Sequence, residues 1–201
     1  LSADILAHNK KEPFDVSEMK ALSLERDNAI TFKANKPIHM RVKDGKWGLF
    51  FNGTQSLTSN VTLPTNYRYN SPYTISAWVL STKVGPISTV TSLSSSRADL
   101  ANTEFRLGTD PSTGLMNHNG SFESSGAQKD IAAGEGKWQF WTITFDGWME
   151  KVYLNGKLLK EKNNFLMIRP EGRITIGADA AGTNNFMGYI NSIMILPTAI
   201  D

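Results

Sequence analysis

Apolar and polar residues alternate with a period of two along much of the chain, and this period is typical of β-strands with one buried face. The clearest example is the run 138–160, in which Asp146-Gly147 and Asn155-Gly156 separate three apolar and aromatic segments. Two-residue Asp-Gly and Asn-Gly connections are strong hairpin signals. We therefore predict three consecutive antiparallel strands. One face of the first strand carries Gln139, Trp141, Ile143 and Phe145.

Similar short runs, bounded by Gly, Pro, Asn and Asp, predict a chain made almost wholly of strands. Residues 73–80 alternate most regularly and are predicted to form a central strand. The stretch 34–37, which ends in Pro37, is predicted to separate the first two strands. The predicted strands outside 138–160 are 29–33, 38–43, 46–51, 55–58, 73–80, 87–93, 103–107, 114–118, 173–177 and 186–196.

The pattern predicts a single folded domain over residues 17–201. Residues 1–16 are polar and weakly patterned, and Pro13 disfavours a helix, so they are predicted to be an N-terminal tail or linker. Residues 108–136 are the most loop-like part of the chain, rich in Gly, Ser, Asn and Asp. Loops of this composition often carry binding residues.

Composition narrows the function classes. A chain of 201 residues, 40% of them hydrophobic, is long enough for one sizeable core. A net charge of +2 gives no reason to expect nucleic acid as a partner, and no apolar run approaches the roughly 18 residues of a membrane span. The absence of cysteine excludes disulfides and thiolate chemistry. The first residue is Leu1, which suggests a processed protein or a piece of a longer one.

Five segments occur in the order and spacing of a known family. They are Phe50-Phe51-Asn52-Gly53, YTISAWV at 73–79, WQFWTITFDGWMEKVYLNGKLL at 138–159, ITIGAD at 174–179 and FMGYINSIMIL at 186–196. Over residues 46–201 the chain resembles the concanavalin A-like, laminin-G-like jelly-roll domains of bacteria. The resemblance implies an all-β fold with two curved antiparallel sheets packed face to face. Many such domains are carbohydrate-binding or adhesive modules of larger secreted or cell-surface proteins.

Glucanases of this fold carry Glu-x-Asp-x-x-Glu on one strand, because glycoside hydrolysis needs two carboxyl groups around the scissile bond. The sequence lacks this motif, since neither Glu104 nor Glu150 has a second carboxylate two residues further on. The histidines have no triad or zinc-site spacing; they are His8, His39 and His118. The residues therefore favour a protein without catalytic activity.

The five tryptophans are candidate platforms for a sugar ring, because an aromatic face stacks on the apolar face of a pyranose. Trp78 and Trp138 match framework positions of the family, and Trp141 shares the apolar face of its strand, so these three are predicted to be structural. For Trp47 and Trp148 the sequence does not decide between a structural role and a binding role. Trp148 directly follows a predicted turn, where side chains are often exposed, and is a candidate ligand contact.

Polar loop residues are the other candidate ligand contacts, because they offer hydrogen-bond donors, acceptors and one stacking ring. The alternative for each is an ordinary solvated surface residue. The candidates are Arg97, Asp99, Asn117, His118, Asn119, Phe122 and Glu123.

Calcium occurs in related folds, where carboxylates and backbone carbonyls bind it. The family often has an aspartate in a Gly-x-Ile-Asp pattern in its last strand, and Asn191 stands there in this chain. A neutral amide weakens the case for a metal at that position. Asp179 is the remaining metal candidate, with a turn-forming role as its alternative. No other cofactor is indicated.

We expect a non-catalytic carbohydrate-binding or adhesive module, secreted, periplasmic or on the cell surface, whose partner is a glycan or polysaccharide. The alternative is a structural or protein-interaction domain that packs on a neighbouring domain of the same chain. Such a domain should expose a large apolar patch. A glycoside hydrolase is the third hypothesis.

Overall fold

The computed structural model describes residues 1–21, 30–94, 104–108, 134–163 and 168–200, and most of its regular structure is β-strand. The predicted all-β class is confirmed, while the predicted strand 114–118 lies outside the described residues. No helix within these ranges is long and apolar enough to cross a membrane. The elements are α1 (Ala3–Leu6), β1 (Phe14–Lys20), β2 (Thr31–Lys43), β3 (Lys46–Asn52), β4 (Leu57–Ser59), a 3-10 helix (Thr65–Tyr67), β5 (Tyr73–Ser81), β6 (Ser88–Ser94), β7 (Glu104–Leu107), β8 (Gln139–Phe145), β9 (Met149–Leu154), β10 (Lys157–Asn163), β11 (Arg173–Ile176) and β12 (Met187–Leu196).

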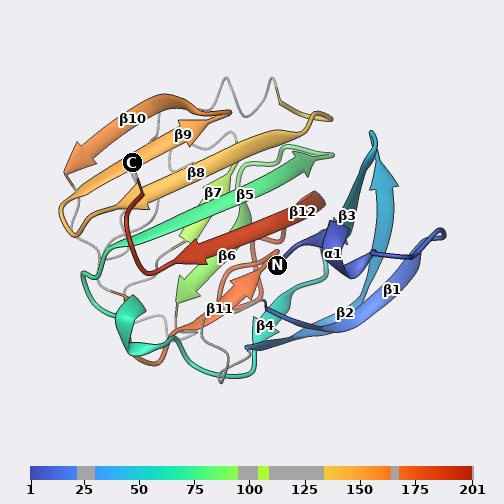
Figure 1. Cartoon of the computed structure of the whole chain (residues 1–201), viewed down its shortest axis with the longest axis horizontal. Helices are drawn as coiled ribbons and strands as arrows, with labels where there is room; N and C mark the ends of the chain where they lie inside the picture. Colours follow the sequence, from blue (N-terminus) through green and yellow to red (C-terminus); the bar gives the residue numbers. More distant parts are fainter. Residues whose placement is uncertain (22–29, 95–103, 109–133, 164–167, 201) are drawn as a thin grey trace.

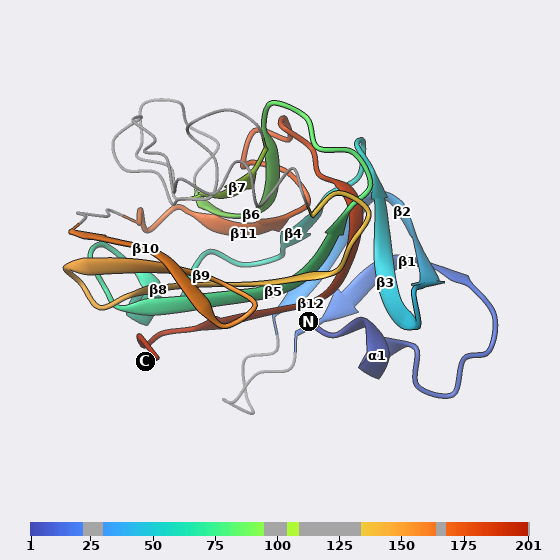
Figure 2. The same ribbon diagram turned by 90° about the horizontal axis from the view of Figure 1, so that it is seen from above.

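The paired strands form one antiparallel ladder that folds over on itself. Its order is β10-β9-β8-β5-β12-β3-β2-β4-β11-β6-β7, with β1 paired to β2. Figure 2 shows the two layers: β10, β9, β8, β5 and β12 form one, and β4, β11, β6 and β7 form the other. β3 and β2 connect them at one side. This is the predicted two-sheet antiparallel sandwich.

The core lies between the two layers and is filled by alternate residues of each strand. The rings of Phe105 in β7 and Trp141 in β8 have centroids 6.1 Å apart, so they join the layers. The face predicted for β8 is confirmed, because its members point into this core. The buried core residues of β5 and β8 are Tyr73, Ile75, Ala77, Val79, Trp141, Ile143 and Phe145.

The run 138–160 forms the predicted three-stranded meander β8-β9-β10. Asn155 and Gly156 have φ angles of 50° and 80°, and a two-residue hairpin turn of type I′ requires positive φ at both positions. The Asn-Gly pair therefore fixes the register of β9 against β10. Figure 1 shows the meander along one edge of its layer.

β2 is one strand of 13 residues, so the predicted break at 34–37 is wrong. The strand changes partner in this stretch: β4 pairs with it up to Ala34, and β3 pairs with it from His39. Pro37 lies between the two ladders and opposite a register shift in β1. Its missing N–H therefore removes no ladder hydrogen bond, which is why proline is tolerated inside this strand.

The N-terminal residues pack onto the sandwich, in contrast to the predicted tail or linker over 1–16. Ser2 forms a β-bridge with Ser192, and the Ile193 N–H donates to the Leu1 carbonyl at 3.0 Å. α1 follows between β12 and β3 (Figure 1), and Ala3 is buried there. β1 also begins before the predicted boundary at residue 16. The reason is that β12 and β3 diverge, which leaves backbone groups of β12 free to bond the first residues.

Asn191 ties α1 to the sandwich. Its Nδ2 donates to Asp4 Oδ2 at 2.9 Å and to the Trp47 carbonyl at 2.8 Å. Asn191 is itself buried, so its amide has little access to water. An aspartate would place a carboxylate against two acceptors. The geometry explains why an amide stands at position 191.

Asn191→Asp is expected to lower the free energy of unfolding by about 1–3 kcal/mol at neutral pH, because it places a buried carboxylate against the Asp4 carboxylate and the Trp47 carbonyl in place of their donor. Urea unfolding measures the change. Asn60→Asp is the matched control, since the Asn60 Oδ1 atom accepts a bond from the Thr31 N–H and aspartate keeps that role. Equal urea midpoints for wild type and Asn191→Asp would contradict the assignment.

Candidate functional site

Two aromatic side chains stand out on the surface of the described residues. Trp148 is 64% exposed and Tyr69 is 54% exposed, whereas the other exposed large hydrophobic residues are aliphatic. An exposed ring is unusual enough to suggest a contact surface when its position is also fixed. The exposure expected for Trp148 is therefore observed, and its role as a ligand contact stays a prediction.

The turn between β8 and β9 holds Trp148 in place. Asp146 Oδ1 accepts hydrogen bonds from the backbone N–H groups of Trp148 at 2.8 Å and of Met149 at 2.6 Å. These bonds from Met149 and Trp148 lower the pKa of Asp146, because they stabilise its charged form. Gly147 has a φ of 101°, a conformation that glycine adopts without a Cβ clash. The turn is therefore stiff, although its tryptophan is exposed.

The loop that leads into β5 holds Tyr69 in an uncommon backbone conformation. Its φ is 59°, which for a residue with a Cβ costs roughly 1–2 kcal/mol. The Tyr69 N–H donates to the Ile168 carbonyl at 2.6 Å, and the Ile168 N–H donates back at 3.0 Å. Arg68 Nε and Nη2 both donate to the Leu63 carbonyl. Backbone strain of this kind, retained by its surroundings, is typical of functional positions.

Asn70 joins the two turns. Its Nδ2 donates to the Gly147 carbonyl at 2.5 Å, so Tyr69 and Trp148 are each one residue from the same hydrogen bond. The pairing of Tyr73 with Phe145 brings the start of β5 beside the end of β8. Both turns lie at the left-hand end of the sandwich in Figure 1. Two exposed rings and nearby amide and carboxylate groups can together contact the apolar face and the hydroxyls of a sugar.

Sequence reasoning missed Tyr69, because it lies in the polar stretch 64–72, which has no strand or helix period. The available signal was an aromatic residue inside a loop otherwise made of turn formers. The candidates Arg97, Asp99, Asn117, His118, Asn119 and Phe122, together with Glu123, lie outside the described residues and stay predictions.

The other tryptophans are partly or fully buried. Trp141 has no exposed surface and lies in the core, as predicted. Trp78 and Trp138 are half-buried on the opposite face of the same layer. Trp47 is also half-buried, and its ring centroid lies 6.2 Å from that of Phe14. Only Trp148 among the five projects into solvent.

The carboxylate of Asp179 is fully engaged by the protein. Its two oxygens accept bonds from the Ala181 N–H at 3.1 Å, from the Thr183 N–H at 2.7 Å and hydroxyl at 2.6 Å, and from Asn184 Nδ2 at 2.9 Å. A carboxylate has about four acceptor positions, so this donor set fits the turn-forming role of Asp179, and its role as a metal ligand stays a prediction. Within the described ranges, no three His, Asp or Glu side chains group closely enough to hold a metal.

The two glutamates considered for catalysis lie in opposite layers, on β7 and β9. Glu104 is buried, and its carboxylate pairs with the Arg106 guanidinium at 2.5 Å. Burial raises the pKa of Glu104, and the Arg106 charge opposes this effect. Glu150 is also buried. The pKa of Tyr73 is raised well above its usual value, first by the burial of the Tyr73 hydroxyl and then by the nearby Glu150 charge. The two carboxyl groups therefore lack the arrangement of the glucanase motif, in which carboxylates of one strand flank the scissile glycosidic bond.

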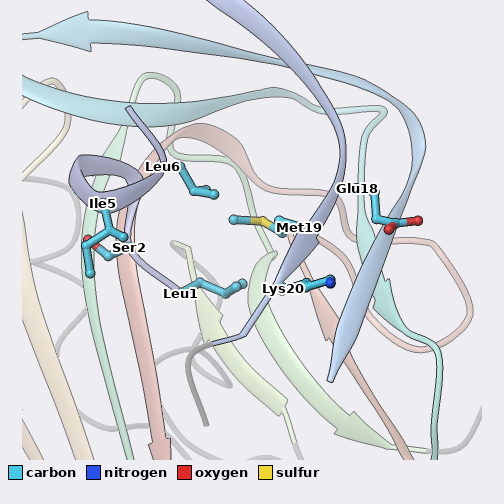
Figure 3. Close-up of a pocket in the computed structure, with 7 residues that line it drawn as sticks. All are labelled: Leu1, Ser2, Ile5, Leu6, Glu18, Met19 and Lys20. Atoms are coloured by element: carbon cyan, nitrogen blue, oxygen red, sulfur yellow. The ribbon is translucent and has the colours of Figure 1, made fainter. Parts of the chain in front are cut away.

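A pocket of about 410 Å³ lies between α1 and β1 (Figure 3). Its volume is at the lower end of the range for small-molecule sites, roughly 300–1,000 Å³. Figure 3 shows the side chains of Leu6 and Met19 turned toward one another. Ile5 at its rim is 57% exposed. The lining residues are Leu1, Ser2, Ile5, Leu6, Glu18, Met19 and Lys20.

The folded ladder defines the protein as a two-layer antiparallel β-sandwich. A model of the concanavalin A-like lectin/glucanases superfamily matches residues 52–201. The chain therefore belongs to this superfamily, which confirms the resemblance seen in its strand motifs. A search of curated protein sequences finds no significant match.

Solved structures of low sequence identity share this fold. Domain 4 of a GH43 extracellular arabinanase from Geobacillus stearothermophilus, solved with arabinotriose, aligns with a TM-score of 0.65 at 17% identity over 95% of this chain and 96% of that one. The binding domain of botulinum neurotoxin DC, in complex with SialylT, aligns with a TM-score of 0.53 at 16% identity over 92% of this chain. The chain spans about half of that domain, 48%.

Proposed function

We propose that the protein is a non-catalytic carbohydrate-binding or adhesive module of a larger secreted, periplasmic or surface bacterial protein. The observation that carries this proposal is the pair of exposed rings, Tyr69 and Trp148, on two turns joined through Asn70. Membership of a lectin/glucanase superfamily supports a glycan as the ligand. The arabinotriose complex of the arabinanase domain supports it further, because this chain covers nearly that entire domain.

The stiffness of the two turns favours binding of a glycan. A sugar ring that stacks on Trp148 loses apolar hydration, and its hydroxyls can reach the amide of Asn70 and the carboxylate of Asp146. Because hydrogen bonds already fix both turns, little conformational entropy is lost when the ligand binds. This mechanism needs no calcium ion, and the loop candidates are proposed as additional contacts: Arg97, Asp99, Asn117, His118, Asn119 and Phe122.

A glycan array followed by calorimetry tests the proposal, with and without a calcium chelator. Trp148→Ala and Tyr69→Ala are each expected to weaken binding of the selected glycan about tenfold or more, equivalent to about 1.4 kcal/mol. Leu158→Ala is the matched control, since Leu158 is 43% exposed at the start of β10, away from the paired turns. Its affinity should equal that of wild type.

Two outcomes would overturn the proposal. One is the absence of binding to plant, host and microbial glycans on the array. The other is unchanged affinity of a bound glycan in both ring variants, which would place its site elsewhere on the molecule.

The second candidate function is a protein-interaction domain, and the apolar pocket beneath Ile5 favours it. A neighbouring domain that covers this pocket would bury Ile5. Ile5→Glu is then expected to release the two domains in the full-length protein, measured as faster proteolysis between them. An unchanged cleavage pattern would count against this candidate.

A further inference from the structure

Five aromatic rings gather on the face of the β8-β5-β12 layer that points away from the core. In register, Phe50 of β3 lies opposite Tyr189 of β12, and Tyr189 lies opposite Leu80 of β5. Their chain neighbours Leu49 and Ile190 belong to the core, so these side chains point outward. The five rings are each partly exposed: Phe50, Trp78, Trp138, Phe140 and Tyr189.

The rings form two contacting groups on four neighbouring strands. Ring centroids are 4.8 Å apart for Phe50 and Tyr189, and 5.2 Å apart for Trp78 and Phe140. Trp138 lies 6.4 Å from Tyr189, and its Nε1 donates to the Lys43 carbonyl at 2.9 Å. The surface is therefore held in place before any ligand binds.

Gly48 makes room for this cluster. A Cβ at this position would lie 3.1 Å from Tyr189 Cβ and 3.2 Å from Trp138 Cη2, closer than most such contacts. The two rings can therefore lie against the backbone of β3. A larger residue would push these two rings outward.

The β2-β3 hairpin carries three cations, and two of them lie over rings of this face. Arg41 Cζ lies 5.2 Å from the Phe50 ring centroid, and Lys46 Nζ lies 5.0 Å from the Trp78 ring centroid. Lys43 pairs directly with Lys46 across the hairpin. Like charges in direct cross-strand register repel one another, so this end of the hairpin concentrates positive charge beside the rings. Asp44 offsets part of the charge through its contact with Lys43 at 3.3 Å.

We propose that this basic aromatic face, formed by the five rings with Arg41, Lys43 and Lys46, binds an acidic saccharide that carries carboxylates. The guanidinium of Arg41 suits a carboxylate because it presents paired donors in one plane. The ring edges contact the apolar surface of the sugar. The inference shares only its ligand class with the proposed function, because it concerns a different surface.

The two surfaces lie at opposite ends of the same strands. Tyr73 and Phe145 pair beside the turns of Tyr69 and Trp148, whereas Val79 and Gln139 pair beside the basic aromatic face. At about 3.3 Å per residue, the length of β8 separates them by about 20 Å. Each surface can therefore be changed without altering the other.

An acidic saccharide fits this face better than a single-stranded nucleic acid. Nucleic acid requires a basic groove that follows the backbone over several nucleotides, with rings free to stack on bases. Here the cations are confined to one hairpin and the rings are half-buried and tilted, with interplanar angles of 40° and 34° for the two closest pairs. The net charge of +2 agrees with this assignment.

Titration with a polyuronate, with its methyl-esterified neutral form and with an oligothymidylate tests the proposal. The double variant Arg41→Gln/Lys46→Gln is expected to bind the polyuronate at least tenfold more weakly than wild type. Salt should weaken wild-type binding strongly and the variant little, because ionic strength screens surface charges. Lys36→Gln/Lys157→Gln is the control: it makes the same charge change at two exposed lysines and should stay within twofold of wild type.

Tryptophan fluorescence in the Trp148→Ala background removes the signal of the Trp148 turn, and of the four remaining tryptophans Trp78 and Trp138 lie on the face itself. Quenching by the polyuronate but not by its neutral ester is the expected result. Equal affinity of the double variant and wild type would overturn the inference, even if Trp148→Ala abolished neutral glycan binding and so supported the proposed function. Tighter binding of oligothymidylate than of polyuronate would overturn the ligand class.

Discussion

Gly188→Ala is expected to lower the free energy of unfolding by about 2–5 kcal/mol, the sum of a Cβ at positive φ and of overpacking. Gly188 lies inside β12, paired with Phe51 on one side and Ser81 on the other, at a φ of 149°. An added Cβ would overlap the Leu80 carbonyl oxygen and lie 2.9 Å from Ser81 Cα. Both neighbours are backbone atoms of the central ladder, so they cannot rotate away.

Two other glycines separate the contributions of φ and of space. Gly156 has a φ of 80°, and an added Cβ there would meet no atom within 4 Å, so Gly156→Ala should cost only about 1–2 kcal/mol. Gly85 is also open and has no positive φ, so Gly85→Ala should change stability by less than about 1 kcal/mol. The urea midpoint should be highest for Gly85→Ala, lower for Gly156→Ala and lowest for Gly188→Ala. Equal midpoints for the last two would show that β12 can shift.

Trp141→Ala is expected to lower the free energy of unfolding by about 3–5 kcal/mol, because it leaves a large cavity in the core. The Trp141 side chain has no exposed surface and contacts Phe105 of the opposite layer. It also pairs with Ala77 and Leu154 on neighbouring strands. The two layers therefore lose one of their central contacts. Thermal and urea unfolding, monitored by circular dichroism, measure the effect.

Trp148→Ala is the matched comparison, because it removes the same side chain from the adjoining turn. Its stability should stay within about 0.5 kcal/mol of wild type, as for most surface changes, while glycan affinity falls. Trp141→Ala should lose stability but, under conditions where it remains folded, should keep its glycan affinity. A loss of stability for Trp148→Ala as large as that for Trp141→Ala would make Trp148 a structural residue.

Local patterns predict most strands of this protein, because a half-buried strand and its turns are encoded in neighbouring residues. β5 and β8 follow from alternation, and the Asn155-Gly156 turn follows from residues that accept positive φ. Pro37 shows where the same reasoning fails. Its effect depends on whether its N–H has a ladder partner, and only the switch of β2 from β4 to β3 decides that.

The N-terminal residues show a second kind of failure. Nothing in a polar segment that contains a proline indicates that Ala3 is buried or that Ser2 pairs with Ser192. These contacts exist because β3 and β12 diverge, which is a property of the curved sheet. Asn191 has the same origin, since its amide is explained only by Asp4 and the Trp47 carbonyl.

The sequence by itself determined the strand class, most strand positions and their inward faces, and it made Trp148 a candidate for exposure. Apart from the hairpins of the 138–160 meander, the tertiary structure alone decided which strands are neighbours. Backbone hydrogen bonds do not distinguish one strand from another, so strand order depends on how the whole core packs. That order brings Tyr69 beside the turn of Trp148 and places Lys46 over Trp78, and both proposed binding surfaces depend on it.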